Sequence, residues 1–133
     1  MKLKLIVLAL ILTPLTSLAD KRQTCENMTP ERTQELVEVA LSSLCGDAAL
    51  IAETCAGYDP ERDLTLGQAA VAACEKDFLP MLGESDKNMY FDDRSQCEQA
   101  EFPGVTSETQ TQALKAFCKI DLLKRYIGTF TCH

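Results

Sequence analysis

The sequence predicts an all-α protein, a small disulfide-stapled helical bundle of about five helices that follows a cleaved signal peptide. Three observations indicate this fold class. Helix-starting and helix-ending residues recur along the chain, and no apolar–polar alternation typical of a strand competes with them. Seven cysteines are spread over 133 residues, which suits crosslinks between separate helices. With 46% hydrophobic and 25% charged residues, the chain has the composition of one globular domain.

The first nineteen residues have the three-part layout of a secretory signal peptide. Two lysines form a basic head, residues 5–12 are an unbroken apolar run, and small residues precede a cleavage site between Ala19 and Asp20. The apolar run is shorter than the roughly 20 residues of a membrane-spanning helix, and no later segment is long and apolar enough. We therefore expect a signal peptide, 1–19, and a single mature domain, 20–133, with a formal net charge of −9 in place of −7.

Export and a high cysteine content predict disulfides in an oxidising compartment, either the periplasm or the extracellular space. Successive cysteines are 20, 10, 19, 23, 21 and 14 residues apart. Structural zinc sites usually hold two cysteines two to four residues apart, so we expect no metal and no cofactor. The disulfide candidates are Cys25, Cys45, Cys55, Cys74, Cys97, Cys118 and Cys132.

The first two helices are expected at 30–45 and 47–55. Thr29 supplies a hydroxyl cap, and a proline and an acid follow it, as at many helix starts. Gly46 is expected to end the first helix, and Asp47 to cap the second. Helical spacing places five apolar residues of the first helix on one face: Val37, Ala40, Leu41, Leu44 and Cys45.

Residues 59–61 are expected to form a turn or a single helical turn. Thr65 then opens a third helix with capping-box spacing, and Pro80 must kink or stop it. A fourth, short helix is expected around Cys97. Ser107 matches the capping box again and opens a last helix of about twenty residues, with Gly128 at its expected end.

We expect Cys45 to pair with Cys74. The short link at 46–47 places Cys45 beside residue 48, and an antiparallel third helix places position 74 opposite the same residue. In a disulfide the Cα atoms usually lie about 4.4–6.8 Å apart, and the alanines around Cys74 permit that approach. One of the seven cysteines is left over. Cys132, in the terminal tail, is expected to link a second copy, the alternative being one buried free thiol.

The single histidine, His133, is the last residue, and this position argues against most familiar catalytic layouts. A serine or cysteine nucleophile needs a firmly held imidazole. The two-histidine zinc motif, the haem-attachment motif, the Cys-x-x-Cys redox motif and the glycine-rich nucleotide loops are all absent from the sequence. The acidic balance argues against a nucleic-acid partner. We expect no enzyme.

Residues 84–101 contain six acids and two bases. One interpretation is a docking face for a basic protein, with aromatic residues as its centre. The other is a solvated connector that its aromatic residues pin to the core. The candidate partner-binding residues are Asp86, Tyr90, Phe91, Asp92, Asp93, Glu98 and Glu101.

The expected function is therefore binding. The general layout of signal peptide, acidic helical domain and several cysteines resembles that of periplasmic immunity proteins, which protect bacteria from cell-wall amidases. The resemblance implies an inhibitor or immunity protein that caps a basic exported enzyme. Two alternatives stay open: a carrier of a small apolar ligand within the bundle, and a structural or envelope-interaction protein without a small ligand.

Overall fold

The computed structural model describes residues 24–131, with side chains as far as residue 128. The predicted signal peptide and its cleavage site, together with Cys132 and His133, lie outside this range. Within it the chain is helical and has no strand, which confirms the predicted fold class. The elements are α2 (Pro30–Ser42), α3 (Cys45–Thr54), α4 (Pro60–Phe78), the 3₁₀ turn η1 (Leu79–Met81), α5 (Glu84–Gln99) and α6 (Glu108–Thr131).

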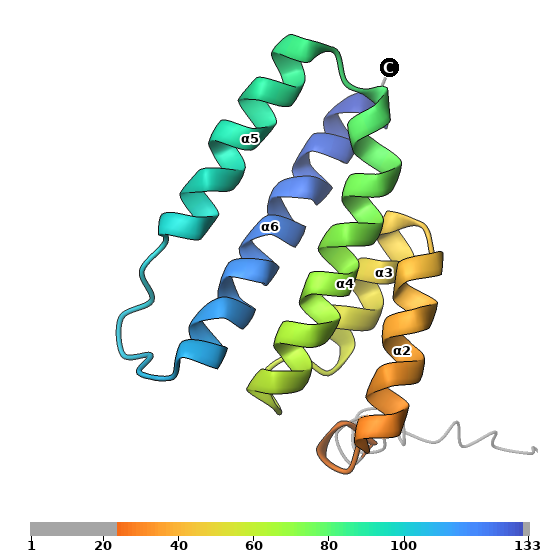
Figure 1. The fold of residues 1–133 in the computed structure, drawn as a ribbon, viewed down its shortest axis with the longest axis vertical. Coiled ribbons are helices and arrows are strands. Elements are labelled where there is room, and N and C mark those ends of the chain that lie inside the picture. Colours follow the sequence, from red (N-terminus) through yellow and green to blue (C-terminus); the bar gives the residue numbers. More distant parts are fainter. Residues whose placement is uncertain (1–23, 132–133) are drawn as a thin grey trace, which may run out of the picture.

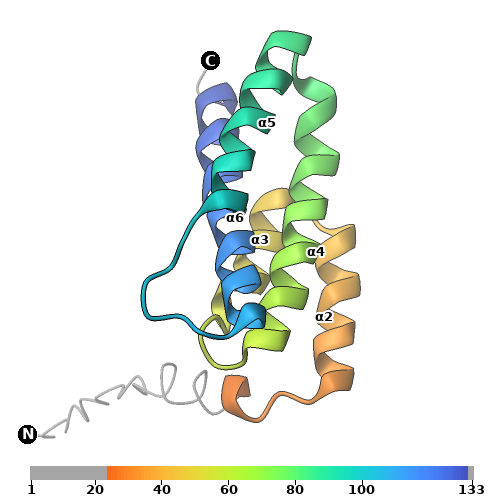
Figure 2. The ribbon, with the colours of Figure 1, turned by 60° about the vertical axis from the view of Figure 1, so that its left-hand side comes forward.

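Helices α4 and α6 run side by side along the length of the molecule (Figure 1). Helix α5 lies beside α6, whereas the hairpin of α2 and α3 covers α4 on the side away from α5 (Figure 2). Both hairpin helices are short, and in the two views they flank only the lower half of α4. The upper ends of α4 and α6 therefore project beyond the α2–α3 corner.

Side-chain caps set the start of three helices. The Thr29 hydroxyl accepts the backbone N–H of Arg32 at 3.2 Å, as the sequence predicts for α2. The Ser107 hydroxyl accepts the N–H of Gln110 at 3.3 Å and begins α6. The Asp59 carboxylate accepts two N–H groups of the first turn of α4, because an Asx cap satisfies donors that have no partner in the helix.

Several boundary predictions were wrong. Helix α4 begins at Pro60, because Asp59 caps it six residues before the predicted cap Thr65. Helix α2 ends at Ser42, and Gly46 lies in the first turn of α3 instead of ending α2. Asp47 lies in the same turn, so the N-cap of α3 is Leu44 and not Asp47. Helix α6 continues through Gly128 to Thr131. The expected connector with a short helix around Cys97 is a 16-residue helix, α5.

Small residues allow the helices to approach closely. A Cβ atom added to Gly67 of α4 would lie 3.0 Å from the Cβ of Ala116 in α6, closer than ordinary van der Waals contact. Alanines fill most of the space between α3 and α4, whereas the upper core is aromatic. There the ring of Phe78 meets Tyr90 at a centroid distance of 5.6 Å and Tyr126 at 5.8 Å, both edge to face.

Three disulfides join Cys25 to Cys55, Cys45 to Cys74 and Cys97 to Cys118. The predicted Cys45–Cys74 pair is confirmed, with its Cα atoms 4.2 Å apart. Each bond connects different parts of the fold: the N-terminal turn to the end of α3, the start of α3 to α4, and α5 to α6. They use six of the seven cysteines, and this crosslinking fits a protein outside the cytoplasm.

Candidate functional site

Tyr90, a predicted docking residue, belongs to the core. It is fully buried, and its hydroxyl donates a hydrogen bond of 2.7 Å to Glu75 Oε1 on α4. Burial, and then this bond to a carboxylate, raises the pKa of Tyr90 well above the usual tyrosine range. Tyr90 therefore pins α5 to the bundle, as the second interpretation of this segment proposed for its aromatic residues.

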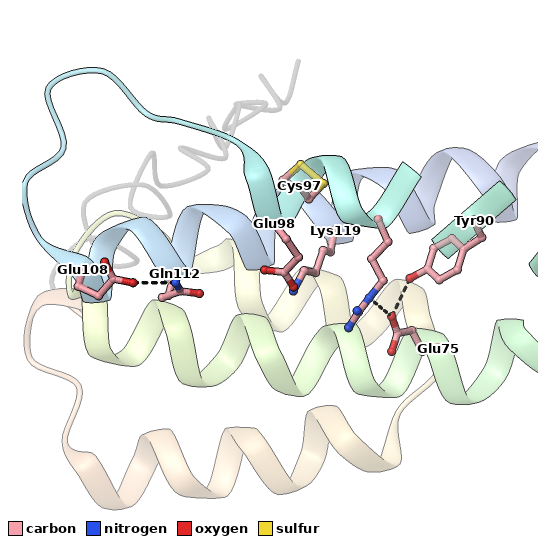
Figure 3. A network of polar contacts seen from close by, with 9 residues as sticks. Glu75, Tyr90, Cys97, Glu98, Glu108, Gln112 and Lys119 are labelled. Carbon is pink, nitrogen blue, oxygen red and sulfur yellow. Dashed lines mark hydrogen bonds and ion pairs between the residues drawn. A yellow bond between two sulfur atoms is a disulfide. The ribbon is translucent and has the colours of Figure 1, made fainter. Parts of the chain in front are cut away.

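Two of the predicted docking acids also have partners inside the protein. The hydroxyl of Tyr126 donates a 2.6 Å hydrogen bond to Asp93 Oδ2. Glu98 forms an ion pair with Lys119 of α6 (Figure 3). The hydrogen bond from Lys119 is the main cause that lowers the pKa of Glu98. These contacts, together with the Cys97–Cys118 disulfide, hold α5 on α6.

Glu75 also contacts Arg94, which reaches across from α5. Arg94 Nε lies 2.7 Å from Glu75 Oε1, close enough for an ion pair, but without the alignment of a hydrogen bond. Glu75 on α4 thus contacts both the Arg94 guanidinium and the Tyr90 hydroxyl of α5 (Figure 3). The charges of Glu75 and Arg94 neutralise each other, so these contacts serve to attach α5 to α4.

The remaining candidates do not form one face. Phe91 and Asp92 are exposed, Asp86 is half-buried, and Glu101 follows the end of α5. Side chains on one face of a helix are spaced three or four residues apart. Phe91 and Asp86 are five residues apart, so they point to different sides of α5. The sequence-predicted docking surface is thus divided between the core, the α5–α6 contact and separate surface positions.

A different surface has the geometry of a docking site. Above the α2–α3 corner lies an open hollow of about 250 Å³, here named the Leu44 hollow. Leu44 is 72% exposed and Met81 is 67% exposed, and both line the same hollow, as in an apolar patch that marks an interaction site. Its lining residues are Leu44, Cys45, Gly46, Asp77, Phe78, Met81 and Ile127.

Sequence reasoning missed this hollow because it placed Leu41 and Leu44 on a buried helical face. The helix ends before Leu44, which turns that side chain outward. The signal that could have revealed this end is the serine pair 42–43. The hydroxyl of Ser43 donates to the carbonyl of Val39 at 2.6 Å, and its N–H donates to the carbonyl of Ala40. Such bonds compete with continuation of the helix.

One carboxylate lines this hollow, and a second lies next to its lining residues in the sequence. Asp77 forms part of its wall and is half-buried. Asp47, in the first turn of α3, follows the lining residues Cys45 and Gly46. Neither carboxylate makes a hydrogen bond or ion pair with another described residue, so both are available to a cation from outside. The hollow therefore combines an apolar lining with one acidic side chain, that of Asp77.

The residues that the structure describes contain no cluster of three metal-ligating side chains, and no described helix is long and apolar enough to cross a membrane. Comparisons with protein-family models, with curated proteins and with solved structures found no match. The class that the fold and surface define is a small, disulfide-crosslinked helical bundle with an open apolar hollow.

Proposed function

We propose that this protein is an exported binding protein that caps a basic protein, such as an exported enzyme, and inhibits it. The observation that carries the proposal is the Leu44 hollow, where two large apolar side chains stand exposed beside the carboxylate of Asp77. Interfaces typically centre on apolar pockets that receive one large side chain and are rimmed by polar groups. A partner that presents a large apolar residue next to a lysine or arginine matches this arrangement.

The hollow is also held rigidly, which favours tight binding. Cys45 lines it and is tied to α4 by the Cys45–Cys74 disulfide. Phe78, in the same wall, is buried against Tyr90 and Tyr126. A preformed surface loses little conformational entropy on binding. The net charge of −7 adds a long-range attraction that speeds association with a basic partner and discriminates against acidic ones.

The test is capture of exported proteins by the immobilised mature chain, followed by identification of the captured partner and measurement of its affinity. Leu44→Ser and Met81→Ser are each expected to weaken binding at least about tenfold, as for a residue at the centre of an interface. Leu50→Ser is the matched control, because Leu50 is 62% exposed on α3 and does not line the hollow. A partner of acidic surface, or equal affinities for all variants, would contradict the proposal.

The proposal includes two features outside the described residues. We propose cleavage after Ala19, so that the exported chain begins at Asp20, and an intact-mass measurement checks it. We also propose that Cys132 links two copies in a disulfide-bonded dimer. Non-reducing electrophoresis of the wild type and of Cys132→Ser tests this link, since only the wild type should run as a dimer.

A further inference from the structure

A second concavity lies at the opposite end of the α2–α3 hairpin. It encloses about 530 Å³ between the N-terminal turn, the first turns of α2 and the end of α3. This volume is within the range of about 300–1,000 Å³ that is usual for small-molecule sites. Its lining residues are Thr24, Cys25, Asn27, Met28, Thr29, Arg32, Leu36, Ile51, Thr54 and Cys55. It shares none of them with the Leu44 hollow, so the two sites can be tested separately.

The walls of this cavity are mostly apolar. Met28, Leu36 and Ile51 are half-buried. Leu36 and Ile51 pack against the core on one side and line the cavity on the other. The Cys25–Cys55 disulfide completes the apolar surface. A ligand in this cavity would gain free energy mainly by removing these side chains, and its own apolar surface, from water.

The disulfide wall is fixed from behind by a buried arginine. The side chain of Arg62 donates hydrogen bonds to the carbonyl oxygens of Cys25 at 2.6 Å and Cys55 at 3.3 Å. The neighbouring Asp63 accepts the N–H of Gly57 at 2.7 Å, which holds the turn after α3. Both side chains are more than nine-tenths buried. The cavity is thus preformed on one side, as ligand sites usually are.

The charges around the cavity disfavour an ionic ligand. Among the described lining residues, Arg32 is the one ionised side chain, and Glu35 already binds it at 2.7 Å. Glu31, in the first turn of α2, accepts hydrogen bonds from its own N–H and from Thr29, which lower its pKa. A carboxylate ligand would therefore meet an arginine that is already paired with Glu35, and an ammonium ligand would find no carboxylate among the described lining residues. The hydroxyl groups of Thr29 and Thr54 already donate inside the protein, to Glu31 and to the Leu50 carbonyl oxygen. Each can therefore only accept a hydrogen bond from a ligand, which suits a neutral donor such as an alcohol.

We propose that this cavity binds a small, uncharged, mainly apolar molecule that carries one hydrogen-bonding group, such as a medium-chain alcohol. The apolar part lies against Leu36, Ile51 and the Cys25–Cys55 disulfide, and the polar group lies at the rim. This site does not depend on the proposed protein partner. It lies at one end of the hairpin and not within the bundle, where the packed aromatic residues occupy the centre of the upper core.

The experiment uses the exported protein and the neutral probe N-phenyl-1-naphthylamine, which fluoresces in apolar sites. We expect saturable fluorescence that 1-decanol displaces at a concentration at least about tenfold lower than decanoate or decylamine, because burying either ion without a partner is costly. Ile51→Trp should fill the cavity and weaken probe binding at least about tenfold, since it removes the apolar surface that the probe contacts. Leu50→Trp is the matched control, because Leu50 is the adjacent residue of α3, is exposed and does not line the cavity. This variant should bind the probe as the wild type does.

A second measurement does not depend on either variant folding. Bound 1-decanol should slow reduction of Cys25–Cys55 by dithiothreitol, measured by peptide mapping, and leave the rate at Cys97–Cys118 unchanged. The proposal is overturned if the wild type gives no saturable fluorescence or if the three competitors displace the probe equally. It is also overturned if Leu44→Ser abolishes probe binding, which would place the probe in the Leu44 hollow, or if both disulfides are reduced at unaltered rates.

Discussion

The Cα atoms of Cys45 and Cys74 are 4.2 Å apart. The axes of packed helices usually lie about 8–10 Å apart, so the backbones of α3 and α4 approach each other closely at this disulfide. The disulfide between them draws the start of α3 onto α4, and fully or nearly fully buried alanines surround it, among them Ala70 and Ala73. Neither helix has room for a larger side chain at this contact. The same contact holds Cys45 in the wall of the Leu44 hollow.

Ala73→Leu should therefore destabilise the protein by about 1–3 kcal/mol, because extra methylene groups in a filled core force side chains and backbone to shift. Ala72→Leu, one position along the same helix but exposed, should change the free energy of unfolding by less than about 0.5 kcal/mol. Urea denaturation of the oxidised proteins measures both. Equal effects at the two positions would mean that α3 and α4 are less closely packed than their disulfide indicates.

Asp92 and Asp93 should respond differently to charge reversal. Asp92 is exposed, so Asp92→Lys should leave the melting temperature nearly unchanged. Asp93→Lys removes the acceptor of the Tyr126 hydroxyl and should cost about 1–2 kcal/mol. Differential scanning calorimetry compares them. If Asp92→Lys were the more damaging change, the assignment of Asp93 as the residue that attaches α5 to α6 would be wrong.

Because the pKa of Tyr126 is raised in the folded protein, we expect the protein to lose stability at high pH. Burial, and then its hydrogen bond to Asp93, raises the pKa of Tyr126 to about 12. The pKa of tyrosine in an unfolded chain is about 10. The raised pKa stabilises the folded protein fully below pH 10, and this contribution is lost as the pH rises from 10 to 12. Tyr126→Phe should show a smaller loss over that window in pH-dependent urea denaturation. Parallel curves for the two proteins would refute this linkage.

Arg62 should contribute more to stability than any exposed arginine. Arg62→Met leaves the carbonyl groups of Cys25 and Cys55 without these donors, and we expect a loss of about 2–3 kcal/mol. Arg32→Met is the control, because the Arg32–Glu35 pair is exposed and should contribute less than about 1 kcal/mol. Hydrogen exchange around Gly57 should rise only in Arg62→Met. Unchanged exchange there would show that Asp63 alone holds the turn.

The fold class and one of the three disulfides, Cys45–Cys74, could be predicted from the sequence alone. Helix starts at Thr29 and Ser107 were predictable because caps are local, side-chain-to-backbone interactions within four residues. The Cys45–Cys74 pair was predictable because a short link leaves the chain almost no choice of position. The two caps depend on neighbouring residues, and the disulfide depends on the order in which short links and helices follow one another along the chain.

The tertiary structure decided the helix ends and the sites. Tyr90 and Phe91 are adjacent in an acidic segment, yet one is fully buried and the other 46% exposed, because only packing on α6 fixes which side of α5 faces inward. Leu44 became a surface residue because α2 ends two positions before it. Both concave sites consist of segments distant in sequence, such as Leu44 with Ile127. Their shape arises from the unequal lengths of packed helices, a property that no local pattern encodes.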